Sequence, residues 1–164
     1  MTTTRPDLSV GAAAKADLAF LLEHAGRVLS TELTARLAEL GISQRDYVVL
    51  SKAIAGDLTQ IKLAETCELD KSTMVNTLDE LEKAGLIDRP PAPTDRRARL
   101  VSLTDKGLEL QVKAKRIVVG VYRDVLGALP DDERSGLVNG LIRLVGDRLS
   151  TPVESERVPR RRRK

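Results

Sequence analysis

The stretch LTQIKLAETCELDKSTMVNTLDELEKAG, residues 58–85, decides the fold of this chain. Thr59 and Asp70 are residue types that cap helix N-termini, and each stands directly before a segment with apolar residues at helical spacing. The inward face of the second segment is predicted to consist of Met74, Leu78 and Leu81. We therefore predict two short helices that meet at a tight turn near residues 68–70.

Two short β-prone segments follow this helix pair, GLIDR at residues 85–89 and ARLVSLT at residues 98–104. Val101 and Leu103 fall on one face of the second segment. The connection between the segments contains three prolines, at positions 90, 91 and 93, which restrict the loop. We predict a hairpin over residues 85–104, called the wing below, directly after a helix–turn–helix.

Longer helices are predicted on both sides of this region. Apolar residues recur every three or four positions from about residue 16 to residue 40, where Gly41 ends the helix. Ser43 is a plausible N-cap for a second helix. The side chains expected to point inward from that helix are Tyr47, Leu50, Ala53 and Ile54. Thr104 and Pro130 are predicted to open two further helices, over residues 105–129 and 131–149. The predicted fold is mainly α with a small β-hairpin wing.

Composition is that of a soluble globular protein in the cytoplasm. The 164 residues are 41% hydrophobic but only 2% aromatic, so Leu, Val, Ile and Ala must fill the interior. No apolar run approaches the roughly 20 residues of a membrane span, and MTTTRPDLSV at the N-terminus does not resemble a signal peptide. We therefore predict no membrane association.

The chain holds one cysteine, Cys67, and one histidine, His24. One cysteine excludes an internal disulfide, and the pair cannot form a structural zinc site within one chain. No glycine-rich phosphate loop and no nucleophile–base pair is recognisable, so we predict neither enzymatic activity nor a cofactor. Cys67 occupies an apolar position, which favours a buried core residue over a redox sensor.

Charge is distributed unevenly along the chain. Residues 150–164 carry six basic residues against two acidic ones, a net charge of +4, which leaves −1 for residues 1–149. We predict that residues 150–164 are a disordered basic tail. Attraction to a polyanion must come from this tail or from local patches, because the folded body is nearly neutral.

The first two turns of the helix after Asp70 present small, polar or basic side chains: Lys71, Ser72, Thr73, Val75 and Asn76. Hydroxyl and backbone N–H groups at a helix start bind phosphate, Asn can pair with adenine, and a Val methyl can meet the methyl of thymine. This pattern suits a helix in the major groove of DNA. A solvated first turn explains it equally well.

The tip of the wing carries Asp95, Arg96 and Arg97, followed by Arg99. An exposed acid–arginine pair adds only about 0–1 kcal/mol of stability, so orientation of Arg97 by Asp95 is the better explanation. An oriented arginine on a narrow hairpin fits the minor groove, where the negative potential is strong. The alternative, a solvated charged turn, treats the adjoining helix–turn–helix as coincidence.

Residues 57–107, DLTQIKLAETCELDKSTMVNTLDELEKAGLIDRPPAPTDRRARLVSLTDKG, closely resemble the MarR family of winged helix–turn–helix transcription regulators. The resemblance includes the Leu-Thr-Gln start, Gly85-Leu86-Ile87, Asp95-Arg96-Arg97 and Leu103-Thr104 with Gly107. It implies an obligate homodimer that binds a pseudo-palindromic operator through a recognition helix and a wing from each subunit. The family often has arginine where this chain has Asn76, so an operator cannot be carried over from relatives.

The resemblance also implies a division of the chain. Residues 1–42 would form an N-terminal arm and a dimerisation helix, residues 43–104 the DNA-binding region, and residues 105–149 the C-terminal dimerisation helices. In many members a small anionic or phenolic ligand binds between these parts and weakens DNA binding. His24 and Tyr47 are candidate ligand-binding residues, although His24 fits a solvated helix surface and Tyr47 fits the core.

The leading hypothesis is a sequence-specific transcription regulator, a ligand-responsive repressor that binds double-stranded DNA as a homodimer. The first alternative is a non-specific architectural nucleic-acid-binding protein driven by the basic tail. The second is a winged helix used only for contact with another protein.

Overall fold

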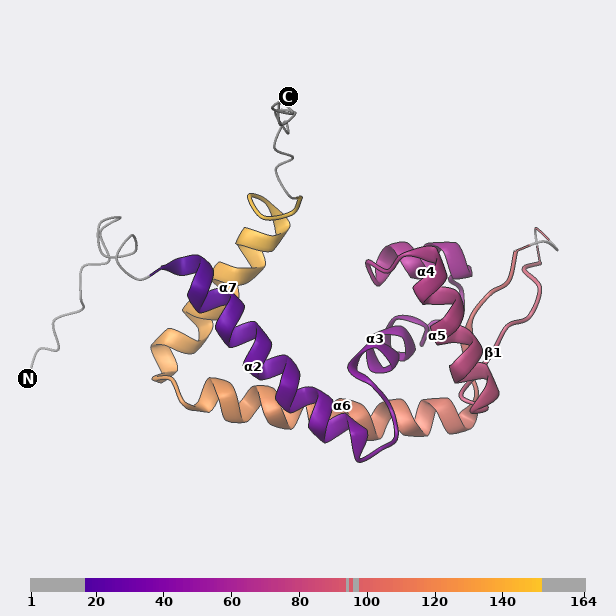
Figure 1. Cartoon of the computed structure of the whole chain (residues 1–164), viewed down its shortest axis with the longest axis horizontal. Helices are drawn as coiled ribbons and strands as arrows, with labels where there is room; N and C mark the ends of the chain where they lie inside the picture. Colours follow the sequence, from indigo (N-terminus) through magenta and orange to yellow (C-terminus); the bar gives the residue numbers. More distant parts are fainter. Residues whose placement is uncertain (1–16, 94, 96–97, 152–164) are drawn as a thin grey trace, which may run out of the picture. The chain divides into compact units, whose positions relative to one another are not determined.

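The computed structural model describes residues 17–93, 95 and 98–151, and within them six helices and one two-stranded sheet (Figure 1). The predicted fold class is confirmed. The chain divides into two compact units, residues 1–121 and residues 122–164. The wing-tip residues Arg96 and Arg97, residues 1–16 of the predicted arm and residues 152–164 of the predicted tail lie outside the described residues.

The first unit begins with α2 (Leu18–Ala38) and α3 (Gln44–Lys52). Gly41 has a φ of +72° in the connection, a left-handed conformation that glycine adopts without a steric penalty. The predicted cap of α3 is confirmed: the Ser43 hydroxyl accepts from the backbone N–H of Asp46, and the Asp46 carboxylate accepts from the backbone N–H of Ser43.

The prediction that Ile54 points inward is wrong. Ile54 is 50% exposed, whereas Ala53 is fully buried. The reason is that α3 ends at Lys52 with Ala53 as its C-cap, so Ile54 lies beyond the helix and no longer follows its inner face.

The helix–turn–helix consists of α4 (Gln60–Thr66) and α5 (Lys71–Lys83), which lie side by side (Figure 1). Both predicted caps are confirmed, with Thr59 accepting from the backbone N–H of Lys62 and Asp70 from that of Thr73. The turn between the helices places Glu68 at a φ of +53°, which lets the chain reverse within a few residues.

The core of the first unit forms where α3, α4 and α5 meet. Met74, Leu78 and Leu81 of α5 are at most 3% exposed, as predicted. They pack in one cluster with the fully buried Leu50 of α3 and Leu63 of α4. Burying each such side chain contributes about 1.5–3 kcal/mol, so α5 is held with its opposite face toward solvent.

The wing is an antiparallel pair of β1 (Ile87–Asp88) and β2 (Ser102–Leu103), with Ile87 opposite Leu103. The regular strands are shorter than the sequence pattern indicates, because Pro90 and Pro91 have no N–H group to donate. An isolated bridge joins Pro91 to Arg99 further out. The wing is thus held together by few regular backbone pairs.

A second isolated bridge, between Thr59 and Leu100, attaches the wing to the start of α4. The backbone N–H of Gln60 donates to the carbonyl of Arg99 at 3.1 Å, and that of Val101 donates to the carbonyl of Leu58 at 3.0 Å. The second arm of the wing is therefore hydrogen-bonded through its backbone both to β1 and to the start of α4.

The long helix α6 (Asp105–Gly127) starts against the base of the wing. The Thr104 hydroxyl accepts from the backbone N–H of Gly107 at 3.0 Å and donates to the carbonyl of Gly85 at 2.8 Å. Gly107 is buried, and a Cβ atom at this position would lie 1.9 Å from the carbonyl oxygen of Leu86. Only glycine permits this approach of α6 to the backbone of the wing.

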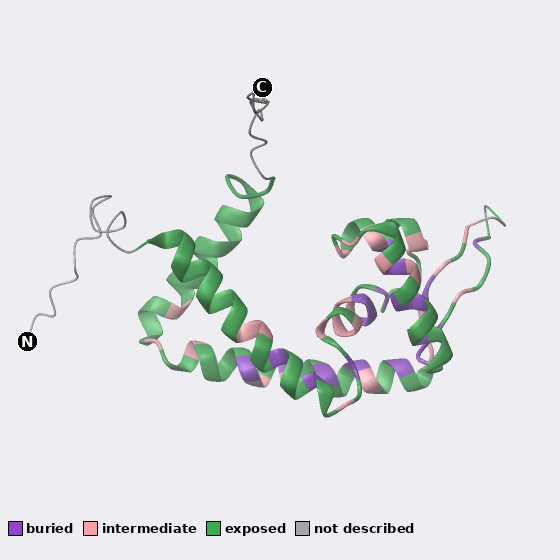
Figure 2. Ribbon diagram, in the orientation of Figure 1, coloured by how far each residue is buried: buried purple, intermediate pink, exposed green. Residues whose placement is uncertain are grey.

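The second unit contains the end of α6 and the helix α7 (Asp131–Gly146). Arg134 donates to the carbonyl of Leu129 at 2.9 Å and pairs with Asp131 at 2.8 Å, which orders the connection between the two helices. No residue of α7 is buried, and Figure 2 shows the helix exposed along its length. None of the helices in the described part of the chain is both long and apolar enough to cross a membrane.

We predict that Gly107→Ala lowers the free energy of unfolding by about 3 kcal/mol, because the new methyl group must displace the backbone at Leu86. The control is Gly120→Ala in the same helix, where nothing lies within 4 Å of the added Cβ. That variant should gain up to about 1 kcal/mol from helix propensity. Chemical denaturation of both variants measures the difference, and equal effects would contradict the close packing at Gly107.

Candidate nucleic-acid interface

Asp70 organises the first turn of α5. One carboxylate oxygen accepts from the hydroxyl of Ser72 at 2.5 Å and from the backbone N–H of Thr73 at 2.9 Å. The other accepts from the hydroxyl of Thr73 at 2.6 Å. Donation from the Ser72 hydroxyl and then from Thr73 holds the pKa of the Asp70 carboxyl well below its usual range.

This arrangement sets the direction of two hydroxyl groups. A carboxylate only accepts hydrogen bonds, so Ser72 and Thr73 must use their single O–H donors on Asp70. Their hydroxyl oxygens keep lone pairs that can accept further hydrogen bonds. Among the side chains of this turn, the ammonium group of Lys71 remains as a hydrogen-bond donor, near the positive end of the helix dipole.

The structure brings four of the five predicted helix residues, Lys71, Ser72, Val75 and Asn76, together on one surface, whose lining does not include Thr73. Lys71, Ser72 and Asn76 are exposed, and Thr73 and Val75 are half-buried. A shallow hollow of about 540 Å³ runs along this surface. Its lining consists of Asp70, Lys71, Ser72, Val75 and Asn76. We call this surface the outward face of α5.

The described part of the wing places Asp95 and Arg99 near the base of the tip, both exposed. The backbone carbonyl of Asp95 accepts from the N–H of Ala98 at 3.0 Å. The guanidinium of Arg99 lies 3.5 Å from the backbone carbonyl of Arg89, to which it donates. Orientation of Arg97 by Asp95 stays a prediction.

An ion-pair cluster between the wing and α5 was missed by the sequence reasoning. Arg89, which follows β1, contacts Asp79 at 2.8 Å and also contacts Glu82, both on α5. Hydrogen bonding from Arg89 lowers the pKa of the Glu82 carboxyl. The signal in the sequence was two acids one helical turn apart, with an arginine seven residues after the second.

The two candidate ligand-binding residues lie on different helices and differ in exposure. His24 is exposed on α2, where its ring stacks on Phe20 at 5.5 Å and its Nδ1 lies 3.1 Å from the guanidinium of Arg27. Tyr47 is half-buried on α3 and packs against the core. Their role in binding a ligand stays a prediction.

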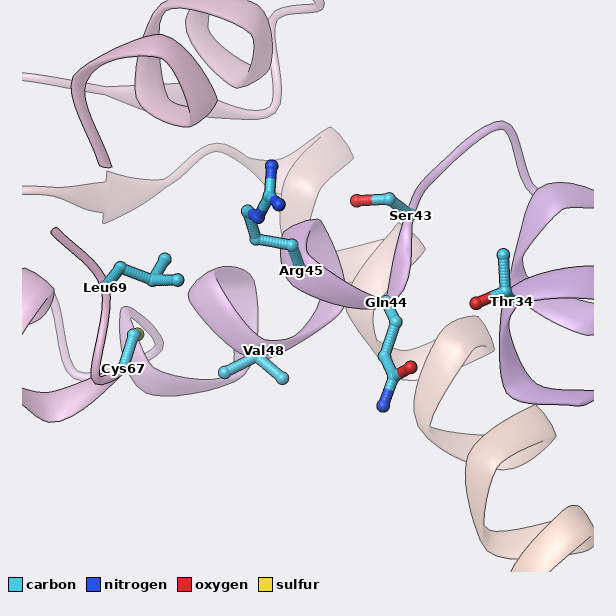
Figure 3. Close-up of a pocket in the computed structure, with 7 residues that line it drawn as sticks. All are labelled: Thr34, Ser43, Gln44, Arg45, Val48, Cys67 and Leu69. Carbon is cyan, nitrogen blue, oxygen red and sulfur yellow. The ribbon is translucent and has the colours of Figure 1, made fainter. Parts of the chain in front are cut away.

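A different hollow, of about 430 Å³, lies at the start of α3 (Figure 3). Neither His24 nor Tyr47 lines it. Its walls come from α2, α3 and the turn before α5, and consist of Thr34, Ser43, Gln44, Arg45, Val48, Cys67 and Leu69. Burial raises the pKa of the Cys67 thiol, which leaves little reactive thiolate at neutral pH.

Comparison with known proteins places this geometry in a family. The MarR family model matches residues 42–98, which span α3, the helix–turn–helix and most of the wing. CouR from Rhodococcus jostii RHA1, in a structure with bound p-coumaroyl-CoA, is 30% identical, with 85% of this chain and 96% of CouR covered at a TM-score of 0.69. The chain belongs to the MarR family.

Two further structures support this assignment. A MarR-family transcriptional regulator from Rhodococcus sp. RHA1 is 28% identical over 85% of this chain and 97% of its own length, with a TM-score of 0.70. The transcriptional repressor CouR bound to a 23-mer DNA duplex is 28% identical over 80% of this chain and 94% of its own, with a TM-score of 0.74. MarR-family proteins are DNA-binding transcription regulators and are generally not enzymes.

We predict that the MarR-family chain is more stable than its Asp70→Asn variant at pH 7, and that this difference shrinks in acid. The folded-state pKa of Asp70 is depressed, so its contribution is present above the unfolded value of about 3.9 and is lost as the pH falls toward the folded value. Thermal melts of both proteins between pH 7 and pH 3 measure this. A difference in melting temperature that stays constant down to pH 3 would contradict the carboxylate network.

Proposed function

We propose that this MarR-family chain is a homodimeric, sequence-specific repressor that binds a pseudo-palindromic DNA operator. The observation that carries the proposal is the outward face of α5, whose polar and basic side chains are held toward solvent by a buried opposite face. The similarity to CouR bound to a DNA duplex supports it.

In this proposal α5 enters the major groove and the wing enters the adjacent minor groove. Asn76 pairs with an adenine edge, Val75 contacts a thymine methyl, and Lys71 contacts phosphate. Arg97, oriented by Asp95, reads the narrow minor groove. Arg96 and Arg99 add contacts to the backbone of the duplex. The hydroxyl oxygens of Ser72 and Thr73 accept from the amino groups of adenine or cytosine.

Dimerisation is supported by apolar side chains that one chain leaves exposed. On α7 they recur at helical spacing and form a stripe of Val138, Leu141, Ile142 and Val145. On α2 they include Leu18, Phe20, Leu21 and Val28. Water-exposed apolar stripes of this kind mark interaction surfaces, and a second copy offers the matching stripe. The partner's α5 would then reach a second half-site about one DNA turn, ~34 Å, away.

Repression follows from occupancy, because a dimer bound over a promoter excludes the transcription machinery. We include control by a small effector, since CouR is similar in fold and binds p-coumaroyl-CoA. His24 and Tyr47 remain the predicted effector contacts. An effector between the dimer helices and the DNA-binding region would alter the spacing of the two copies of α5. A protein of this function acts in the cytoplasm.

The operator is testable by selecting bound fragments from the host genome and footprinting them with the full chain. We expect two protected half-sites one helical turn apart, and Arg97→Ala should cost about 1–3 kcal/mol of affinity for that site. Arg36→Ala, which removes the same charge from the exposed surface of α2, is the control and should bind normally. Unchanged affinity of the Arg97 variant would show that the wing is not used.

The same fragments separate the repressor from the architectural alternative. Deletion of residues 150–164 should reduce affinity for all DNA while the preference for the protected site remains, because the tail attracts phosphate without reading bases. Loss of nearly all binding on deletion would favour an architectural protein. Failure of the full chain to shift any DNA would favour a winged helix that contacts only protein.

We predict that Ile142→Glu converts the dimer to a monomer, because it places a charge in the apolar stripe of α7. Arg143→Glu changes the charge more but lies on the other side of the helix, so it should leave the dimer intact. Light scattering after size-exclusion chromatography measures both masses. A wild-type chain that is monomeric at micromolar concentration would contradict the proposed dimer.

A further inference from the structure

We propose that Arg89 is a positioning residue that fixes the direction of the wing relative to α5, so that both groove contacts are made by one rigid piece. The inference rests on the proposed function and deepens it. Arg89 is not assigned a contact with DNA; it acts through the wing.

The contacts of Arg89 reach two acids on one edge of α5. One terminal nitrogen, Nη2, lies 2.8 Å from the carboxylate of Asp79 and also contacts Glu82, while Nε donates to Glu82 at 3.0 Å. Asp79 and Glu82 are three residues apart and therefore neighbours on the helix surface. The planar guanidinium thus contacts α5 at two points. Two contacts fix the orientation of the Arg89 side chain, whereas a single contact would leave it free to rotate.

Burial distinguishes this cluster from the other ion pairs of the described residues. The Arg89 side chain is 21% exposed, the lowest value among the basic partners of those pairs. Solvent therefore screens its contacts less than it screens an ordinary surface pair. Hydrogen bonding to Glu82 correspondingly raises the pKa of the Arg89 guanidinium.

Hydrogen bonds to the backbone at and just after Arg89 connect this residue to the rest of the wing. Its carbonyl accepts from the guanidinium of Arg99 at 3.5 Å, and the next carbonyl, of Pro90, accepts from the N–H of Leu100 at 2.9 Å. The N–H of Ala92 donates to the carbonyl of Ala98 at 2.9 Å. Both arms of the wing are therefore joined just beyond the residue that is attached to α5.

The wing needs such a contact because its regular sheet is very short. Only two residue pairs belong to β1 and β2, and an isolated hairpin of this size is marginally stable. Beyond the sheet, the direction of the tip depends on the links at Arg89 and at Thr59. Preorganisation lowers the conformational entropy lost on binding, so loosening Arg89 should weaken binding through the wing.

The direction of the change in DNA affinity caused by one substitution distinguishes a positioning role of Arg89 from a simple effect of charge. Glu82→Gln removes a negative charge from α5, so electrostatics alone predicts tighter DNA binding. Loss of the Arg89 contact predicts weaker binding instead. Glu80→Gln, which removes the same charge from an exposed neighbour on α5, is the matched control and should bind as tightly as the wild type or more tightly.

The experiment measures affinity of full-length dimers for the protected genomic fragment, in a cycle of Arg89→Met and Arg97→Ala. We expect Glu82→Gln and Arg89→Met each to weaken binding roughly tenfold. In the Arg97→Ala background, where the tip contact is already lost, Arg89→Met should have little further effect. A melting temperature is recorded for every variant, and Glu82→Gln decides alone if Arg89→Met does not fold.

If the losses of binding free energy from Arg89→Met and Arg97→Ala add in the double variant, the proposal is overturned. Additivity would mean that Arg89 stabilises the protein generally or contacts DNA itself. Unchanged or tighter binding by Glu82→Gln would also overturn it. Either result would leave the proposed function standing, since the wild type would still bind its site. If the wild type prefers no genomic fragment, the proposed function fails and this inference fails with it.

Discussion

Everything in this structure depends on the one-sided burial of α5. Its inward side chains Met74, Leu78 and Leu81 are almost completely removed from solvent by the core of α3 and α4. Rotating the helix would expose them at a cost of about 1.5–3 kcal/mol each and would bury Lys71 and Asn76 in their place. The apolar core therefore decides which side chains face outward.

Polar contacts then add direction to what the core has placed. Asp70 aligns the Ser72 and Thr73 hydroxyls at one end of α5, and Arg89 joins the other end to the wing. The close contact between Gly107 and Leu86 brings α6 against the same wing base. Each link orders neighbouring surface elements that apolar burial alone would leave loosely defined, and precise placement of several side chains is what a reader of DNA grooves requires.

Local signals explain what was predictable from the sequence. The caps at Ser43, Thr59 and Asp70 each involve residues three apart, and the inner face of α5 follows from helical spacing alone. The motif around residues 57–107 identified the family, which the comparisons confirm. The prediction for Ile54 failed because the direction of this side chain depends on where α3 ends, and the spacing of apolar residues does not determine that point. The Arg89 contacts and the Thr59–Leu100 bridge join segments that only the folded chain brings together.

The most direct test of the central claim is a crystal structure of the dimer with its protected DNA fragment. The account predicts Lys71, Val75 and Asn76 of each subunit in successive major grooves, with the wings in the flanking minor grooves. A complex in which the outward face of α5 meets solvent, while other surfaces hold the duplex, would contradict it.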